Sequence, residues 1–271
     1  MWPCSGPGGL SVPILPYRLS SENRYELTLL DISDAKLRLR FQNKPFTFRK
    51  CDISKDRDLV EEIVASHDVV FDLAAYVHPG SFIADPLEVV KLNFFDTLKI
   101  IEACARHECR LIHFSTCEVY GKTGGSAEPF AEDASDCIVG PIANHRWIYS
   151  SAKQLLDRII HAHGLAGDLE YTIVRPFNFV GPLMDFLMDS PDMGNPRVFA
   201  HFMSALIYGR ALQLVDGGHS MRCFTDIEDG TRALQKILEH PEETRNQIIN
   251  IGNPENETTI HDSRPAHEAA L

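Results

Sequence analysis

Residues 109–121 read CRLIHFSTCEVYG. The first part of this stretch is apolar and rich in β-favouring side chains, which predicts a buried strand over 109–115. Hydroxyl, thiol and carboxylate side chains follow where that strand ends. Parallel sheets bind their ligands at the carboxyl ends of their strands, so the stretch indicates both a strand of such a sheet and the edge of a site.

Strands of the same kind alternate with helices over much of the chain. Besides 109–115, short β-rich runs lie at 26–31, 46–52, 68–75 and 171–177. Segments of helical length lie between them, at 58–66, 85–107 and 146–163. This alternation predicts an α/β protein with a doubly wound parallel sheet.

The pattern changes after residue 178. We expect helices over 196–212 and 226–241, and short strands over 213–218 and 248–254. These elements predict a smaller lobe over 179–260, which covers a ligand and is interleaved with the region that forms the sheet.

Composition excludes several classes of function. The formal net charge is −12 over 271 residues and no run is basic, which argues against a nucleic-acid partner. No window approaches the roughly 18 consecutive apolar residues of a membrane-spanning helix. The first residues also lack the charged start and apolar stretch of a signal peptide. We therefore expect a soluble, cytoplasmic protein without a membrane partner.

The cysteines support the same compartment. There are seven, scattered along the chain and without a CxxC pair. Neither a disulfide framework nor a metal site is indicated by this spacing. A reducing cytoplasmic setting fits it.

The segment 146–158 reads RWIYSSAKQLLDR and places Tyr149 and Lys153 four residues apart on a predicted helix. Residues at this spacing lie on one face and can act at one point. A tyrosine is a poor base at neutral pH, but a neighbouring ammonium favours the phenolate and lowers its pKa. The pair suits hydride transfer, although an isolated pair of this kind is more often part of an ordinary amphipathic helix.

Other motifs at the ends of predicted strands accompany this pair and form one predicted site with it. Thr116 follows a predicted strand about thirty residues before Tyr149, and RPFNFVGP at 175–182 follows the next strand. With these features the chain resembles the extended short-chain dehydrogenase/reductase family over roughly residues 25–260. The segments STCEVYG, IVGPIANHRWIYSSAKQLLDR, VRPFNFVGP, LVDGGHSMRCFTDIEDG and INIGNPENE narrow the resemblance to the decarboxylases of UDP-glucuronic acid, including UDP-apiose/xylose synthase and a bacterial enzyme of lipid A modification.

The resemblance implies NAD as cofactor, bound by a Rossmann-like region over 25–178, and a UDP-sugar as substrate. Tyr149 would remove the C4 hydroxyl proton of the sugar, Lys153 would lower the pKa of Tyr149 and hold the nicotinamide ribose, and Thr116 would hydrogen-bond the sugar. Glu118 would do acid/base work. The ketone formed at C4 would then accept the electrons released with carbon dioxide.

The resemblance also implies which residues contact the cofactor and which contact the substrate. Toward the cofactor the resemblance implies Asp31, Asp52 and Ile53, in addition to Tyr149 and Lys153. Toward the substrate it implies Val77, Phe82, Thr116, Cys117, Arg146, Asn178, Arg197 and Arg222. An acid at the end of the second strand favours NAD over NADP. Guanidinium groups suit a diphosphate because they bind its oxygens in bidentate fashion.

The resemblance is incomplete at both ends of the sequence. A first βα unit with a GxxGxxG turn is expected before residue 25, whereas the glycines of residues 1–24 lie among prolines, Pro16 included, that oppose a regular strand or helix. We expect an irregular segment there. We also expect a frayed tail over 261–271, in which Arg264 does not match the family's proton-donating arginine.

Three functions stay open on these residues. The first is NAD-dependent oxidative decarboxylation of UDP-glucuronic acid to a UDP-4-keto-pentose or UDP-xylose. The second is ring contraction to UDP-apiose, which Cys117 allows and Val77 disfavours, since the synthase has a second cysteine there. The third is a catalytically degenerate member that binds sugar nucleotides. The family also leads us to expect a homodimer through helices 85–107 and 146–163.

Overall fold

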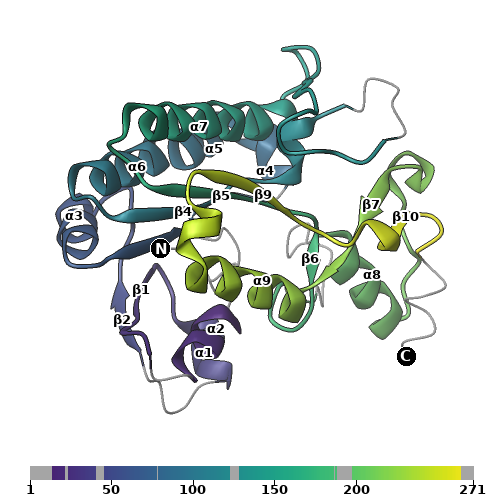
Figure 1. The fold of residues 1–271 in the computed structure, drawn as a ribbon. Coiled ribbons are helices and arrows are strands. Elements are labelled where there is room, and N and C mark those ends of the chain that lie inside the picture. The colour runs from purple at the N-terminus through teal and green to yellow at the C-terminus, as the bar shows by residue number, and fades with distance from the viewer. Residues whose placement is uncertain are drawn as a thin grey trace.

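The computed structural model describes residues 14–21, 24–40, 46–77, 79–122, 128–185, 187 and 197–263. It is a layered α/β arrangement with helices on both faces of a sheet (Figure 1). The expectations for the glycines before residue 13 and for Arg264 fall outside the described residues.

The main sheet has four parallel strands, in the order β3, β4, β5 and β9. Their bounds are β3 (Val69–Asp72), β4 (Arg110–Phe114), β5 (Tyr171–Pro176) and β9 (Gln247–Ile251). Every residue of β4 is buried, as expected for an apolar strand of a parallel sheet that lies between two helical layers. The strands predicted over 68–75, 109–115, 171–177 and 248–254 are confirmed.

A second parallel pair lies beside the main sheet. It consists of β1 (Thr28–Asp31) and β2 (Thr47–Lys50), where the sequence predicts strands. The ring of His67, which comes just before β3, lies 2.9 Å from Thr28 Oγ1 through its Nε2. This contact fastens the start of β1 to the start of β3.

Helices cover both faces of the sheet. One layer holds α3 (Arg57–Ala65), α5 (Pro86–Val90), η1 (Lys91–Asp96), α6 (Thr97–Arg106) and α7 (Trp147–Ala166), and the other holds α1 (Ile14–Ser20), α2 (Ala35–Arg40) and α9 (Ile227–Glu239) (Figure 1). Each layer encloses its own apolar core. Leu156 and Ile160 of α7 pack in the first core, and Leu234 and Ile237 of α9 pack in the second. The doubly wound arrangement is confirmed.

The helix predicted over 85–107 contains a change of hydrogen-bond pattern. The π-helical segment η1 joins α5 to α6, and α4 (Pro79–Ala84) precedes α5. Such π turns are rare and are frequent at functional sites. The buried Asn93 of η1 accepts a hydrogen bond from Tyr76 N at 2.7 Å and donates one to Tyr76 O at 3.0 Å. The loop after β3 is thereby fixed to the helix.

The first described residues correct one expectation. The sequence predicts an irregular segment before residue 25, yet Ile14–Ser20 form the regular helix α1, with Pro16 in its first turn. Proline is tolerated there because the first N–H groups of a helix have no intrahelical acceptor. Leu15 and Leu19 are buried in the same core as α9, and this burial stabilises the helix.

The remaining elements are short and build the smaller lobe and its connections. They are β6 (Phe179–Val180) paired with β8 (Thr225–Asp226), β7 (Met221–Cys223) paired with β10 (Glu257–Thr259), α8 (Val198–Ile207), α10 (Pro241–Thr244), η4 (Val215–Gly218) and η5 (Pro254–Asn256). The helices predicted over 196–212 and 226–241 are confirmed as α8 and α9.

The strand predicted over 213–218 is wrong. The structure has the short turn η4 there, because Asp216 and Gly217 adopt left-handed backbone conformations with φ of 49° and 64°. A residue in that conformation cannot continue an extended strand. The strand of this region, β7, begins at Met221 instead.

Candidate active site

The polar residues after β4 lie at the carboxyl edge of the main sheet. They form the short 3-10 turn η2 (Cys117–Tyr120), and Thr116 caps it, since its Oγ1 accepts a hydrogen bond from Glu118 N at 3.2 Å. Thr116 is buried, while Cys117 and Glu118 are half-buried. The cap fixes the turn, so these side chains have set places at the end of the strand.

Tyr149 and Lys153 lie near the start of α7 and are buried, with 5% and 1% of their surfaces exposed. Lys153 Nζ donates a hydrogen bond to Phe114 O at 2.8 Å, which fastens the helix to the end of β4. Burial lowers the pKa of Lys153, and the carboxylates of Asp72 and Asp157 oppose that shift. The structure thus places the predicted pair directly above the end of the central strand.

The ring of Tyr149 stacks on Phe82, with centroids 4.8 Å apart and 10° between the planes. Phe82 lies on α4 and is 1% exposed. Tyr76 and Val77, in the loop after β3, pack against the same small cluster. Phe82 therefore orients the ring of Tyr149, while sugar contacts of Phe82 and Val77 stay predictions.

The sequence assigns Glu118 and Arg146 to different tasks, and the structure joins them in one ion pair. Arg146 Nη1 and Nη2 donate to the two carboxylate oxygens of Glu118 at 3.2 and 3.1 Å. The side chains are 27% and 32% exposed, so an incoming anion can reach the pair. Because Arg146 comes just before α7, the pair connects η2 to the helix that carries Tyr149.

Cys117 keeps its proton at neutral pH. Burial and the charge of Glu118 raise the pKa of its thiol to about 12, although Arg222 and a hydrogen bond from the backbone N–H of Asn178 act in the opposite direction. A protonated thiol can donate a hydrogen bond or fill space but is a poor nucleophile. These interactions also show that Cys117, Asn178 and Arg222, far apart in sequence, lie near one another.

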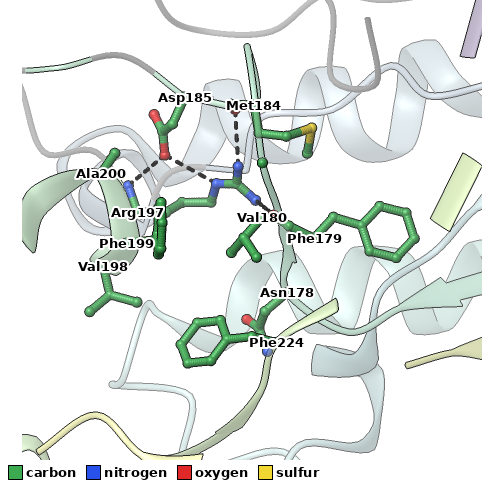
Figure 2. Close-up of a pocket in the computed structure, with 11 residues that line it drawn as sticks. Asn178, Phe179, Val180, Met184, Asp185, Arg197, Val198, Phe199, Ala200 and Phe224 are labelled. Atoms are coloured by element: carbon green, nitrogen blue, oxygen red, sulfur yellow. Dashed lines mark hydrogen bonds and ion pairs between the residues drawn. The ribbon is translucent and has the colours of Figure 1, made fainter. Parts of the chain in front are cut away.

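Asn178 connects β5 to β6 with a φ of 37°, a left-handed conformation that asparagine adopts more readily than most residues. Its Nδ2 donates to Cys223 O at 3.0 Å. A pocket lies beside it, with aromatic side chains from Phe199 and Phe224 in its wall (Figure 2). The backbone strain at Asn178 therefore coincides with the wall of a pocket, as strain often does at binding sites.

Arg197 lies on the wall of the same pocket and is bound by the chain itself. Its Nε donates to Asp185 Oδ2 at 3.2 Å, and its two Nη atoms donate to Phe179 O and Met184 O, each at 3.0 Å (Figure 2). The guanidinium thus shapes the pocket, and its predicted contact with a nucleotide stays a prediction.

Arg222 lies in β7, where its Nη1 donates to Met221 O at 2.7 Å. It forms no ion pair with another residue that the structure describes. Its charge is therefore available to an anion near Cys117, as the sequence predicts for a substrate contact.

The residues predicted for the cofactor lie at the ends of β1 and β2. Asp31 ends β1, is buried, and accepts a hydrogen bond from Ser33 N at 2.9 Å. Asp52 follows β2 and is ion-paired with Lys55 at 2.6 Å, while Ile53 packs into the core. Contacts of these residues with adenosine stay predictions.

The chemistry of these residues fits a dinucleotide. An acid at the end of a parallel strand is the usual partner of the ribose hydroxyls, and Asp31 has that place. An ammonium has three N–H donors, of which Lys153 uses one on Phe114 O among the described residues. No acceptor for the other two is found among the described residues, so they are available to a ligand such as a ribose hydroxyl.

Sequence reasoning missed two buried hydrogen-bonded pairs between the main sheet and α7. His113 Nδ1 and Asp72 Oδ2 are 2.8 Å apart, and Arg175 Nη2 donates to Asp157 Oδ2 at 3.0 Å. The sequence held a signal for the first pair, since Asp72 and His113 interrupt otherwise apolar strand runs. A polar residue at an inward position of a buried strand needs a partner.

Comparisons with known proteins agree with this geometry. The model of the NAD dependent epimerase/dehydratase family matches residues 15–252. UDP-D-apiose/UDP-D-xylose synthase of Oryza sativa subsp. japonica is 40% identical over 276 residues, which cover 94% of this chain and 69% of the relative. UDP-D-apiose/UDP-D-xylose synthase 1 of Arabidopsis thaliana is 39% identical and is covered to 71%, again by 94% of this chain.

Solved structures extend the comparison. The PbgP3 protein from Burkholderia pseudomallei has a TM-score of 0.84 and 34% identity, covering 93% of this chain and 75% of that one. UDP-glucuronic acid 4-epimerase from Bacillus cereus, in complex with UDP-glucuronic acid and NAD, has a TM-score of 0.77 at 23% identity, covering 98% and 81%. At that identity the second likeness shows the fold alone. With matches that extend over most of its length, the chain belongs to the NAD dependent epimerase/dehydratase family.

Proposed function

We propose that the chain catalyses NAD-dependent oxidative decarboxylation of UDP-glucuronic acid to a UDP-4-keto-pentose or UDP-xylose. The observation that carries the proposal is that Tyr149 and Lys153 lie at the same end of the sheet as the ion pair of Glu118 and Arg146. The relatives named UDP-D-apiose/UDP-D-xylose synthase support this substrate class.

Each residue has a task that its surroundings favour. NAD, when bound, supplies the oxidising power that converts the C4 hydroxyl of the sugar into a ketone. Tyr149 takes the proton of that hydroxyl, and the ammonium of Lys153 makes the phenolate accessible. Thr116 hydrogen-bonds the sugar. Once C4 is a ketone, carbon dioxide can leave C5, because the carbonyl oxygen holds the electron pair of the broken bond.

The ion pair provides acid/base capacity and a place for an anion. Both oxygens of Glu118 accept hydrogen bonds from Arg146. A carboxylate or phosphate of the substrate would compete for the same guanidinium. Its arrival would release Glu118, which is then free to move a proton at the sugar.

The pocket beside Asn178 is the place that we propose for the nucleotide. Its aromatic walls can stack on a base, and Arg197 closes one side (Figure 2). Its volume is about 40 Å³, enough for a few water molecules at roughly 10–15 Å³ each. A base therefore needs Phe199 and Phe224 to move apart, so we expect the pocket to widen on binding.

Ring contraction to UDP-apiose is the second candidate, because the relatives are named for both products. Cys117 lies at the sugar end of the site as a protonated thiol. Val77, in the loop opposite, has no thiol to assist it. NMR analysis of the product separates the two reactions, since a branched furanose and a pyranose have different coupling patterns.

Incubation with UDP-glucuronate and NAD tests the main proposal. We expect release of carbon dioxide and a pentose nucleotide, and a loss of activity of at least roughly 100-fold in Tyr149→Phe, the lower limit of what general-base catalysis contributes. If the parent protein releases neither product, the proposal fails.

Calorimetry distinguishes an active enzyme from a catalytically degenerate family member that only binds sugar nucleotides. A degenerate member would bind UDP-sugars without binding NAD. Heat released on titration with NAD supports an enzyme, whereas binding of UDP-glucuronate alone supports the degenerate role. The two titrations need no turnover.

We also propose that the protein works as a homodimer in the cytoplasm. The described cysteines are free thiols, which fits a reducing compartment. No helix among the described residues is both long and apolar enough to cross a membrane. Cell fractionation tests the compartment, and analytical ultracentrifugation tests the dimer.

A further inference from the structure

A layer of buried charges lies between the main sheet and α7, and the proposed reaction uses only Lys153 among them. Asp72 of β3 and His113 of β4 are register neighbours, and both are fully buried. His113 Nδ1 and Asp72 Oδ2 are 2.8 Å apart. Burying a carboxylate is costly unless it is paired and hydrogen-bonded, so this pair between two strands of the main sheet needs an explanation.

The pair faces the helix that carries the proposed catalytic residues. Side chains two residues apart along a strand share a face. Val70 and Leu111, two residues before Asp72 and His113, pack in the same core as Leu156 of α7. The two buried polar side chains therefore point toward α7 as well.

The titratable groups around the ammonium come from four elements. They are Asp72 of β3, His113 of β4, Arg175 of β5, and Tyr149 and Asp157 of α7. Asp157 is bound by Arg175, whose Nη2 donates to its Oδ2 at 3.0 Å. Asp72 has no Lys or Arg partner of this kind among the described residues, since its hydrogen bonds come from His113 and a backbone N–H.

The protonation states follow from these contacts. Burial and the positive charge of Lys153 lower the pKa of His113, so the ring is neutral and its Nδ1–H donates to the carboxylate. Burial opposes ionisation of Asp72, but the interactions with His113 and, to a smaller extent, the charge of Lys153 outweigh it and hold the pKa of Asp72 below its ordinary value. His113 Nε2 has no hydrogen-bond partner in the described part of the chain, which fits a ring with a single proton.

We propose that Asp72 is a positioning residue of the reaction: its carboxylate, held by His113, is the buried counter-charge that keeps Lys153 an ammonium beneath Tyr149. The task of Lys153 itself rests on the proposed function. Asp157 also favours the ammonium, but it is ion-paired with Arg175 and shares its charge with that guanidinium. Without Asp72 the ammonium would keep only this shared carboxylate, and the neutral amine would be favoured in the buried site.

The substitution Asp72→Asn removes the charge and keeps the size of the side chain. We expect Lys153 to lose its proton at a pH lower by about one unit or more, which is usual when a buried group loses a nearby opposite charge. NMR of the chain without ligands, labelled with ¹³C at the lysine ε carbon, follows this titration. The signal of Lys153 is assigned by its loss in Lys153→Arg. The alkaline limb of the decarboxylation rate should move in the same direction.

A matched pair near the other end of α7 serves as control. His163 Nδ1 and Asp168 Oδ1 are 2.9 Å apart, but both side chains are partly exposed. Asp168→Asn should change neither the Lys153 titration nor the alkaline limb. In the buried pair, His113→Asn keeps a side-chain N–H donor for Asp72, so Lys153 should titrate close to its pH in the parent protein. His113→Leu removes that donor, so the Lys153 titration should shift as it does in Asp72→Asn.

Three outcomes decide the proposal. If Asp72→Asn lowers the melting temperature but leaves the Lys153 titration in place, the role is structural and the proposal is overturned. If the variant does not fold, ¹⁵N NMR of the histidines in the parent decides: a neutral His113 protonated at Nδ1 supports the proposal, and a doubly protonated ring, which would neutralise Asp72 itself, overturns it. A shifted titration in a chain without decarboxylase activity counts against the proposed function alone.

Discussion

Single side chains in the site are held by partners within the chain, and a ligand has to compete with them. Arg146 is bound by Glu118, and Arg197 by Asp185 and two carbonyl oxygens. Arg146 and Glu118 are 32% and 27% exposed, whereas Asp185, the partner of Arg197, is only 11% exposed. A partly exposed ion pair such as that of Arg146 and Glu118 contributes little to stability, about 0–1 kcal/mol. Exchange of Glu118 for a ligand anion on Arg146 therefore costs little folding free energy.

We expect Arg146→Lys to lower kcat/KM for UDP-glucuronate by roughly 10- to 100-fold, because a lysine cannot bind an anion through two parallel N–H groups. The melting temperature should change by no more than about 4 °C, since the ion pair is partly exposed. Steady-state kinetics and thermal unfolding measure the two effects. Arg245→Lys, in another exposed ion pair, should leave kcat/KM unchanged, and equal kinetics for both variants would contradict the assignment of Arg146.

Cys117 should react slowly with iodoacetamide, which attacks the thiolate. With a pKa of about 12, about one thiol in 10⁴ is ionised at pH 8. The labelling rate should rise about tenfold with each pH unit and show no plateau below pH 10. Mass spectrometry of the labelled peptides measures this, with the partly exposed Cys137 as comparison. Labelling of Cys117 at pH 8 as fast as that of Cys137 would show that the thiol is not held neutral.

The sequence predicts those site residues whose relation lies within one element. Tyr149 and Lys153 are four apart on a helix, so helical geometry alone brings them together. Glu118 and Arg146 are 28 residues apart and belong to different elements. Asp72 and His113 meet only through the register of two strands. Neither meeting can be derived from local spacing, because each depends on how the elements pack.

Among the elements, the strands follow from their apolar β-favouring runs, and the long helices from their length and periodicity. The π turn η1 could not be predicted, since one extra residue in a helical turn leaves the apolar pattern nearly unchanged. The turn η4 replaces a predicted strand because its glycines and Asp216 favour left-handed conformations. Helix α1 forms despite Pro16 because burial of its apolar side chains in the core stabilises it more than the proline destabilises it.

The π turn matters because Asn93 fixes both backbone groups of Tyr76. Asn93→Leu keeps a similar size and leaves a buried donor and acceptor unpaired, which should cost about 2–5 kcal/mol of unfolding free energy. Urea unfolding measures this cost. Hydrogen exchange at Tyr76 N–H should also accelerate in Asn93→Leu.

Asn93→Asp is the control for this prediction. It keeps an acceptor for Tyr76 N, so exchange there should stay slower than in Asn93→Leu. Identical exchange at Tyr76 in the parent and both variants would mean that the loop after β3 is held by other contacts.

The molecule as a whole exposes apolar side chains on one helical layer. Leu87 of α5, Phe95 of η1 and Leu155 of α7 are 79%, 55% and 48% exposed, and these elements pack against one another (Figure 1). Exposed apolar groups on neighbouring elements mark interaction surfaces. This layer is also where the sequence predicts a dimer interface.

The double variant Leu87→Asp, Phe95→Asp should be monomeric, because two carboxylates would be buried in the interface. The parent should sediment with twice the mass of one chain. Analytical ultracentrifugation measures both masses. Val215→Asp, which changes an exposed apolar residue of the smaller lobe, should leave the mass unchanged. A monomeric parent would contradict the proposed homodimer.

The pairing of β9 with β5 has a consequence for biosynthesis. The two strands are neighbours in the sheet, yet residues 177–246 separate them in the chain. A ribosome adds about 5–20 residues per second, so one edge of β5 waits unpaired while residues 177–246 are translated. An unpaired edge can pair with other chains. Nascent chains stalled before residue 247 should be cut by protease within the sheet region, whereas chains long enough to free β9 from the exit tunnel should resist it. Synthesis of β9, the last strand of the main sheet, would then decide when the newly synthesised protein becomes protected from aggregation.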